Sequence, residues 1–121
     1  MPELSEATIT DAERMVLERL ATRLQHEVGA EAVWLYGARA RGEAPTEDSD
    51  IDVLVIAPGE KRSSGGQAYR LVFEIAKELG VNPVPFSIHV WDRDYLQERR
   101  EIKSSFVGQI DGEKIVLLGE V

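Results

Sequence analysis

Two aspartates at the start of an apolar run are the residues best placed to do chemistry in this chain. Asp50 and Asp52 flank Ile51 in the segment Ile51–Ile56 (IDVLVI). Because side chains alternate across a strand, both carboxylates would project from one face, with their Cα atoms roughly 7 Å apart. Like charges on one face repel each other, and aspartate is depleted in strands. Mg²⁺ would compensate, since it commonly joins one or two carboxylates to substrate phosphates.

Such a pair of acids has two interpretations. A two-ion site, with Mg²⁺ ions about 3.5–4 Å apart, would stabilise both the attacking and the leaving oxygen of an in-line displacement at phosphorus. Alternatively, the strand begins at the rim of a sheet and its acids are solvated, because Asp-x-Asp alone is a short and common pattern.

The turn before these acids adds groups that suit a phosphate. Gly37 ends the apolar run Ala32–Tyr36, and a glycine there lets backbone N–H groups approach phosphate closely. Arg39 and Arg41 follow and could neutralise triphosphate oxygens. A helical turn over residues 38–41 would also favour an anion at its N-terminus. Each arginine could instead form a weak surface ion pair with a nearby acid: Glu43, Glu47 or Asp48.

Two helices with apolar faces should support this segment. Thr10 and Glu13 have the spacing of a capping box, ahead of a helix over Asp11–Val28 that Gly29 would stop. A second helix is expected over Gln67–Leu79, after a flexible-looking stretch at residues 57–66.

The residue pattern of the C-terminal half predicts two more strands and a helix. A strand is expected over Val84–Trp91, where Pro83 and Pro85 would be tolerated at the entrance of the strand or at an edge of the sheet. Asp92 suits the N-cap of a helix whose spacing continues to Ile110, and Asp111-Gly112 would form a turn before a strand over Lys114–Leu118. The pattern predicts an α/β (α+β) fold, with a small mixed sheet of about four strands flanked by helices, as a single domain over residues 1–121.

Composition narrows the class of partner. The chain has 121 residues, no cysteine and a formal net charge of −8. A long nucleic acid is disfavoured because an acidic chain repels its phosphates, whereas a nucleotide carried with a metal fits better. No apolar run approaches the roughly 20 residues that span a bilayer, and no N-terminal signal peptide is recognisable. These features favour a cytoplasmic protein without membrane contact. They leave open whether the protein forms a homo-oligomer.

The whole arrangement resembles the polymerase-beta-like nucleotidyltransferase superfamily, and most of all its minimal members, which often serve as antitoxin partners of HEPN-domain proteins. The family signature is Gly-Ser, about ten residues and Asp-x-Asp; here it is Gly37-Ala38, eleven residues and Asp50-Ile51-Asp52. Ser49 and Arg41-Gly42 match the usual surroundings. The resemblance implies a nucleotidyltransferase fold, Asp50 and Asp52 as metal ligands and Gly37 against the triphosphate. It also implies transfer of a nucleoside monophosphate to a hydroxyl, with release of pyrophosphate.

Two departures from the family pattern bear on activity. Ala38 lacks the hydroxyl of the family serine, which would weaken nucleotide binding by on the order of 1.5–3 kcal/mol while leaving the backbone N–H in place. Active members also carry a third carboxylate on a neighbouring strand, and Pro85–Trp91 has no acid. Ser87 or His89 could occupy that position, and His89 could act as a general base near neutral pH. His89 could equally be a structural residue on a half-exposed strand.

Three functions are therefore in play. The first is an Mg²⁺-dependent enzyme that transfers AMP from ATP, or another nucleoside monophosphate, to a protein or small-molecule hydroxyl. The second is a catalytically weak or inactive antitoxin-type module that binds a HEPN-domain partner. The third, a plain α/β domain with an accidental Asp-x-Asp, requires the ordered motif to arise by chance. Aromatic residues have both packing and binding interpretations: Trp34 and Trp91 in the core or on adenine, and Tyr36 as a packing residue or a modified hydroxyl.

Overall fold

Helices and strands alternate along most of the chain. The computed structural model describes residues 7–43, 50–58, 64–81, 85–102 and 106–119. Its elements are α1 (Asp11–Glu27), β1 (Ala32–Tyr36), α2 (Gly37–Ala40), β2 (Ile51–Ile56), α3 (Ser64–Leu79), β3 (Phe86–Trp91), α4 (Arg93–Arg100), α5 (Phe106–Glu113) and β4 (Ile115–Leu118). The predicted helical turn at residues 38–41 is thus present as α2.

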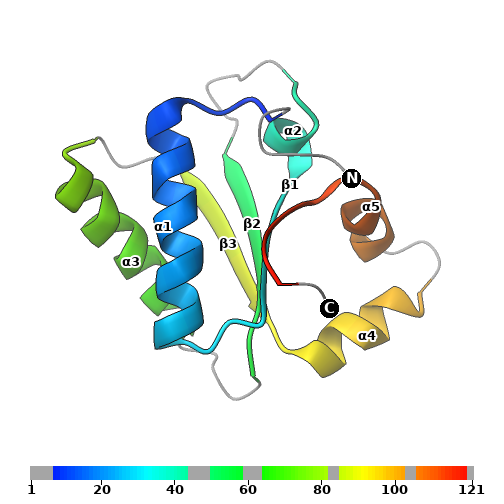
Figure 1. Cartoon of the computed structure of the whole chain (residues 1–121). Helices are drawn as coiled ribbons and strands as arrows, with labels where there is room; N and C mark the ends of the chain where they lie inside the picture. Colours follow the sequence, from blue (N-terminus) through cyan, green and yellow to red (C-terminus); the bar gives the residue numbers. More distant parts are fainter. Residues whose placement is uncertain (1–6, 44–49, 59–63, 82–84, 103–105, 120–121) are drawn as a thin grey trace.

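One mixed sheet forms the centre of the described structure. Its four described strands lie in the order β3-β2-β1-β4; β1 is antiparallel to β2 and β4, and β2 is parallel to β3. Helices α1 and α3 cover one face, and α4 and α5 lie on the other side (Figure 1). The α/β fold and the small mixed sheet are confirmed, and β3 is an edge strand of this sheet, one of the two positions that its prolines allowed.

The two faces of β2 pack against different apolar clusters. Ile51, Val53 and Val55 are fully buried in the cluster that contains the apolar residues of α1 and α3. Leu54 points the other way, into a second cluster that lies against α4 and α5. Because side chains alternate along a strand, Asp52 shares the face of Leu54. Burial of the apolar side therefore fixes the direction of this carboxylate.

A capping network defines the start of α1. The Thr10 hydroxyl accepts the Glu13 N–H at 3.1 Å, and the Glu13 carboxylate accepts the Thr10 N–H at 2.8 Å. This reciprocal pair satisfies two donors that a helix start would otherwise leave unpaired. The helix ends at Glu27, and Gly29 follows with a φ of 69°. The predicted first helix and its capping box are confirmed.

The region after Asp92 differs from the prediction of one continued helix. Helix α4 ends at Arg100 and α5 is a separate helix, so Leu96 and Ile110 reach the same apolar cluster from two directions. The predicted Asp111-Gly112 turn is wrong. The N–H of Lys114 donates to the Ile110 carbonyl at 2.8 Å, which keeps these residues helical.

Other boundaries shift by a few residues. Helix α3 begins at Ser64, inside the stretch predicted to be flexible, and β4 begins at Ile115 rather than Lys114. The predicted start of the third strand, Val84, lies outside the described residues. Of the helices in the described part of the chain, none combines the length and apolar character needed to cross a membrane.

Replacing Glu13 should destabilise the fold through two lost contacts. Besides its capping role, Glu13 forms an ion pair with Arg39 at 3.1 Å, and both side chains are only 10% exposed. Removing one partner of a buried pair costs about 3–5 kcal/mol. We expect Glu13→Ala to lower the free energy of unfolding by about that amount in urea denaturation. Glu18→Ala on the same helix, where the side chain is 56% exposed, is the control and should change it by less than about 0.5 kcal/mol. Equal effects of the two substitutions would contradict this assignment.

Candidate functional site

Asp52 lies on an inner strand, on the face of the sheet that α4 and α5 approach. In the register of the sheet it is paired with Tyr36 of β1 on one side and Ser87 of β3 on the other. The N–H of Ile51 donates to the Pro85 carbonyl at 2.8 Å, which holds the start of β2 against the entrance of β3. Strand pairing thus fixes the backbone that carries the Asp52 carboxylate.

Gly37 is in direct contact with that carboxylate. Its φ is 81°, in the left-handed region, and a Cβ at this position would lie 2.3 Å from Asp52 Oδ2. Both the backbone conformation and the lack of space therefore require glycine. From its place in the sequence, Gly37 was predicted to let a phosphate approach the backbone. In the structure, its lack of a side chain also makes room for Asp52.

The surroundings of Asp52 favour its neutral form. Burial raises the pKa of the Asp52 carboxyl above its usual value, and the negative charge of Asp50 raises it further. His89 and Arg41 lower this pKa, whereas Glu113 adds to the increase. Asp50 itself is exposed just ahead of β2. The two acids are therefore close enough to repel each other, as the sequence predicted.

Glu113, at the end of α5, joins the turn at Gly37 to Arg41. Its Oε1 accepts the Gly37 backbone N–H at 3.2 Å, and its Oε2 accepts a hydrogen bond from Arg41 Nη1 at 2.9 Å. Arg41 Nε also donates to Glu43, the surface partner that the sequence offered as an alternative. Arg41 is thus held beside Gly37 by two carboxylates.

Arg39 points away from the Gly37 turn. Its Nη1 donates to the Glu13 carboxylate and to the Thr8 carbonyl, each at 3.1 Å. The Thr8 N–H in turn donates to the Arg39 carbonyl at 2.8 Å. This buried arrangement matches neither the phosphate contact nor the surface pair considered for Arg39. Its contacts fasten α2 to the segment that leads into α1.

The remaining candidates on β3 lie on the same face as Asp52. Ser87 is the register partner of Asp52, whereas His89 is paired with Leu54, one step further along the strand. His89 is exposed, and its effect on the pKa of Asp52 places its charge near the carboxylate. Ser87 rather than His89 is therefore the β3 residue directly beside Asp52 in the register of the sheet.

Ala38 and the aromatic residues complete the set of candidates. Ala38 is the second residue of α2 and is half-buried, and Ser49 lies outside the described residues. Burial, followed by the charge of Asp52, raises the pKa of the Tyr36 hydroxyl to about 12. Trp34 is fully buried beneath Lys114, whose Nζ lies 3.7 Å from the ring centroid. Trp91 packs edge-on against the ring of Tyr95. Both tryptophans make packing contacts.

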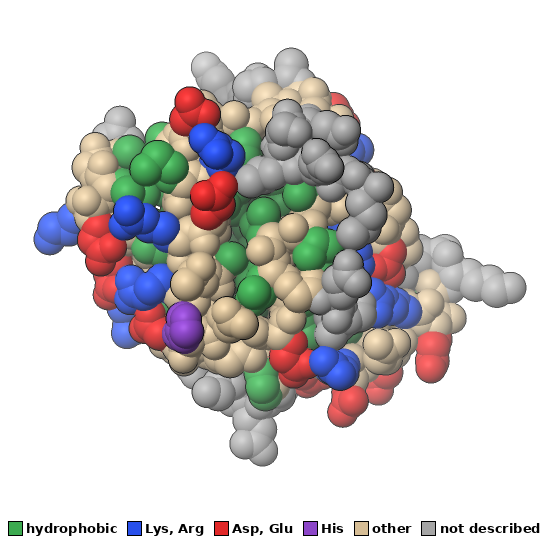
Figure 2. Space-filling view, in the orientation of Figure 1, with side chains coloured by type: hydrophobic (Ala, Val, Ile, Leu, Met, Phe, Trp, Pro, Cys, Tyr) green, Lys and Arg blue, Asp and Glu red, His purple; other side chains and the backbone are tan. Residues whose placement is uncertain are grey.

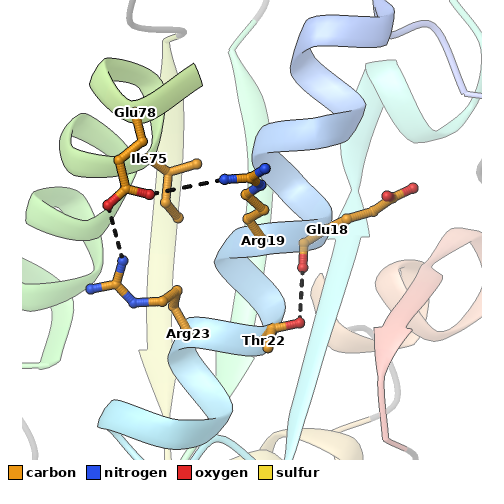
Figure 3. A pocket seen from close by; sticks show the side chains of 6 residues that line it. All are labelled: Glu18, Arg19, Thr22, Arg23, Ile75 and Glu78. Carbon is orange, nitrogen blue, oxygen red and sulfur yellow. Dashed lines mark hydrogen bonds and ion pairs between the residues drawn. The ribbon is translucent and has the colours of Figure 1, made fainter. Parts of the chain in front are cut away.

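A surface cavity of about 350 Å³ lies elsewhere, between α1 and α3 (Figure 3). It is lined by Glu18, Arg19, Thr22, Arg23, Ile75 and Glu78. Glu78 pairs with Arg19 at 4.0 Å and with Arg23 at 3.9 Å, so the acidic and basic side chains that line the cavity offset each other's charge. Figure 2 shows the same pattern of basic beside acidic side chains over these helices. Because the cavity is on the opposite side of the sheet from Asp52, it is not part of this site.

Sequence reasoning missed Glu113. In the sequence it follows a predicted turn and stands 76 residues from Gly37. No local pattern relates residues at that distance, because only the packing of α5 brings them together. Among the described residues, no cluster of three or more histidine, aspartate or glutamate side chains is arranged to hold a metal ion. Asp50 and Asp52 would therefore need oxygen ligands from outside the described chain.

Comparison with solved structures finds distant similarity. A toxin-antitoxin crystal structure with AMP-PNP is 20% identical, with a TM-score of 0.47 over 85% of this chain and 73% of that one. A mutant of the toxin-antitoxin MntA-HpeT is 18% identical, with the same TM-score and the same coverage. A Sulfolobus solfataricus protein described as a nucleotidyltransferase is 23% identical, with a TM-score of 0.40 over 87% of this chain and 80% of that one. Among curated proteins, none matches the chain.

The comparison with protein families identifies the family of this chain. The model described as a nucleotidyltransferase domain matches residues 17–115. That range takes in most of the chain, including the turn at Gly37 and both aspartates at the start of β2. The chain therefore belongs to the nucleotidyltransferase domain family, of the polymerase-beta-like type that its ordered motif resembles.

Proposed function

We propose that this domain binds a nucleoside triphosphate with Mg²⁺ at Asp50 and Asp52 and transfers a nucleoside monophosphate to a hydroxyl group. ATP is the first triphosphate to test, with AMP as the transferred group. The acceptor would be a protein or a small molecule, because a chain with a formal net charge of −8 repels the phosphates of a nucleic acid template.

The observation that carries the proposal is the contact between Asp52 and the Gly37 turn. A Cβ on Gly37 would lie 2.3 Å from the Asp52 carboxylate, so a phosphate beside the Gly37 N–H would also be near a metal ligand. The effect of Asp50 supports the same view, since its negative charge raises the pKa of Asp52. A bound cation would reverse that effect by stabilising both carboxylates.

The donor set suits Mg²⁺. This ion usually keeps several waters and is bound by one or two carboxylates together with substrate phosphates. Two aspartates meet that requirement for one ion, and among the described residues no group of three or more such side chains could hold a metal by itself. When bound, Mg²⁺ neutralises charge on the phosphates and helps to orient them. A second ion would need further ligands from the nucleotide.

The proposed reaction is an in-line displacement at the α-phosphorus. The acceptor oxygen forms a bond to that phosphorus, the bond to the bridging oxygen breaks, and pyrophosphate leaves with its electron pair. The hydroxyl proton passes to a base, for which His89 is the candidate on the Asp52 face. Arg41 and the backbone of Gly37 and Ala38 would bind phosphate oxygens.

Arg39 takes a different part in this proposal. Its buried pairing with Glu13 makes it a positioning residue that holds α2, and hence Gly37, against the rest of the fold. Ser49, which precedes the two aspartates, stays a predicted nucleotide contact from the family motif alone.

A second candidate function is a binding module for a HEPN-domain partner. The observation that favours it is Ser87 beside Asp52, where an active enzyme of the family would carry a third carboxylate. Such a module would keep the nucleotide site but transfer nothing. A complex with the product of a neighbouring gene, formed equally well by Asp50→Asn and Asp52→Asn, would support it. Loss of labelled AMP transfer in those same variants would support the enzyme instead.

Calorimetric titration with ATP in the presence of Mg²⁺ tests the site directly. We expect binding to the wild type and a loss of roughly tenfold to a hundredfold in affinity for Asp52→Asn, as for the loss of contacts to a charged group. Chelation of Mg²⁺ should have a similar effect. Asp11→Asn is the control because it removes the same charge from a side chain that is 95% exposed. Binding that is insensitive to both Asp52→Asn and chelation would refute the proposal.

The pH dependence of stability gives a second test without nucleotide. The pKa of Asp52 is raised in the folded state, so folding favours its protonated form. That contribution is fully present below the unfolded pKa of about 3.9 and is lost as pH rises through the folded pKa. Without divalent cations, Asp52→Asn should gain stability relative to wild type over that range, by less than about 1 kcal/mol because the group is half-exposed.

Thermal unfolding at several pH values measures this difference. Added Mg²⁺ should stabilise the wild type more than Asp52→Asn at neutral pH, because ligands that bind the folded state shift the equilibrium. If the difference in stability between the wild type and Asp52→Asn is constant across the pH range, the predicted charge repulsion at Asp52 is wrong. If Mg²⁺ stabilises both proteins equally, the predicted metal binding by Asp52 is wrong.

A further inference from the structure

The carboxylate of Glu113 is held by the same two groups that the proposed function assigns to phosphate. Its two oxygens accept hydrogen bonds from the Gly37 N–H at 3.2 Å and from Arg41 Nη1 at 2.9 Å. Its side chain is only 14% exposed. A backbone N–H and a guanidinium that converge on two oxygens of one anion form the arrangement in which proteins also bind phosphate.

We infer that Glu113 occupies the phosphate position of the nucleotide-free domain and must leave it before a triphosphate can bind there. This inference rests on the proposed function, because it takes Gly37 and Arg41 as phosphate contacts. It adds a residue that neither the family motif nor the sequence pattern singles out, and it makes Glu113 a determinant of nucleotide affinity.

Displacement needs a side-chain movement only, because the backbone of α5 is anchored separately. Val107 and Ile110 are buried against the sheet, and Asp111 pairs with Arg100 at 2.9 Å. Lys114, just beyond α5, packs its Nζ 3.7 Å from the ring centroid of Trp34. Rotation of the Glu113 side chain would free both donors while these contacts stay in place.

Charge also favours the release of Glu113 when nucleotide arrives. Glu113 contributes to the raised pKa of Asp52, so the two carboxylates oppose each other in the free protein. A triphosphate brings its own negative oxygens to the same donors, and both anions cannot occupy them. Only molecules in which Glu113 has already left these donors can bind the triphosphate. The smaller that fraction is, the lower the apparent affinity for nucleotide.

The test compares Glu113 with Glu43, the other carboxylate on Arg41. Glu43→Gln removes one negative charge and one partner of the same arginine, but within the described part of the chain the Gly37 N–H donates to Glu113 and not to Glu43. ATP with Mg²⁺ is titrated by calorimetry into the wild type, Glu113→Gln, Glu113→Ala and Glu43→Gln. The amide signal of Gly37 in a nitrogen-proton correlation spectrum reports on its N–H partner before and after nucleotide is added.

We expect both Glu113 variants to bind ATP roughly tenfold or more tightly than the wild type, the range that corresponds to removal of a competing hydrogen bond to a charged group. Glu43→Gln should stay within about threefold of the wild type, an effect of the size expected from an exposed pair. The Gly37 amide signal should shift on ATP addition in the wild type, and it should already differ from wild type in the free Glu113 variants.

Other outcomes separate this inference from the function it rests on. Equal affinity in wild type and both Glu113 variants overturns the inference and leaves the nucleotide site standing. Weaker binding in those variants also overturns it, since Glu113 would then help to hold the nucleotide. Absence of ATP binding in all four proteins refutes the proposed function and the inference together.

Discussion

The close approach of the Asp52 carboxylate to the Cα of Gly37 is the constraint on which the rest of the site depends. The two residues belong to different elements, and a Cβ on Gly37 would stand 2.3 Å from Asp52 Oδ2. The register that pairs Tyr36 with Asp52 brings them together, and the positive φ of Gly37 turns the chain away from β1 at that point. Glycine at this position therefore lets the turn lie directly against the carboxylate. The side chain of a larger residue would push the two apart.

That contact needs a rigid frame, which Glu13 and Arg39 supply. Helix α2 has only four residues, and so short a helix has no stability of its own in water. The guanidinium of Arg39 ties it to the capping box of α1, where Glu13 serves the helix start and the ion pair at once. The core beneath β2 fixes the other half of the site through Ile51, Val53 and Val55. The position of Gly37 against Asp52 is thus set by the register of β1 and β2 together with the anchoring of α2 by Arg39 and Glu13.

Local patterns predicted the parts of this frame that depend on local physics. Period-two alternation in residues 51–56 indicated that Ile51, Val53 and Val55 share a buried face and that Asp52 points the other way, and capping spacing located the start of α1. Long-range partners were beyond that reasoning. Arg39 was expected at a phosphate or a surface acid because its partner lies 26 residues earlier, and Glu113 was overlooked because its partner lies 76 residues away. The false turn at Asp111-Gly112 arose because local propensity competes with tertiary pairing, and here Asp111 is held by Arg100 and Lys114.

The charges around Gly37 connect the two candidate functions. The chain has a formal net charge of −8, yet Arg41 and the Gly37 N–H together hold an anion. In this structure that anion is the Glu113 carboxylate. Exchange of that carboxylate for a triphosphate would bring further negative charge to Asp50 and Asp52, so it is favourable only with a divalent cation. Nucleotide binding and metal binding should therefore be linked whether or not transfer follows. On the neighbouring strand Ser87, and not an acid, is beside Asp52, and this is the observation that favours the proposed binding module over the proposed enzyme.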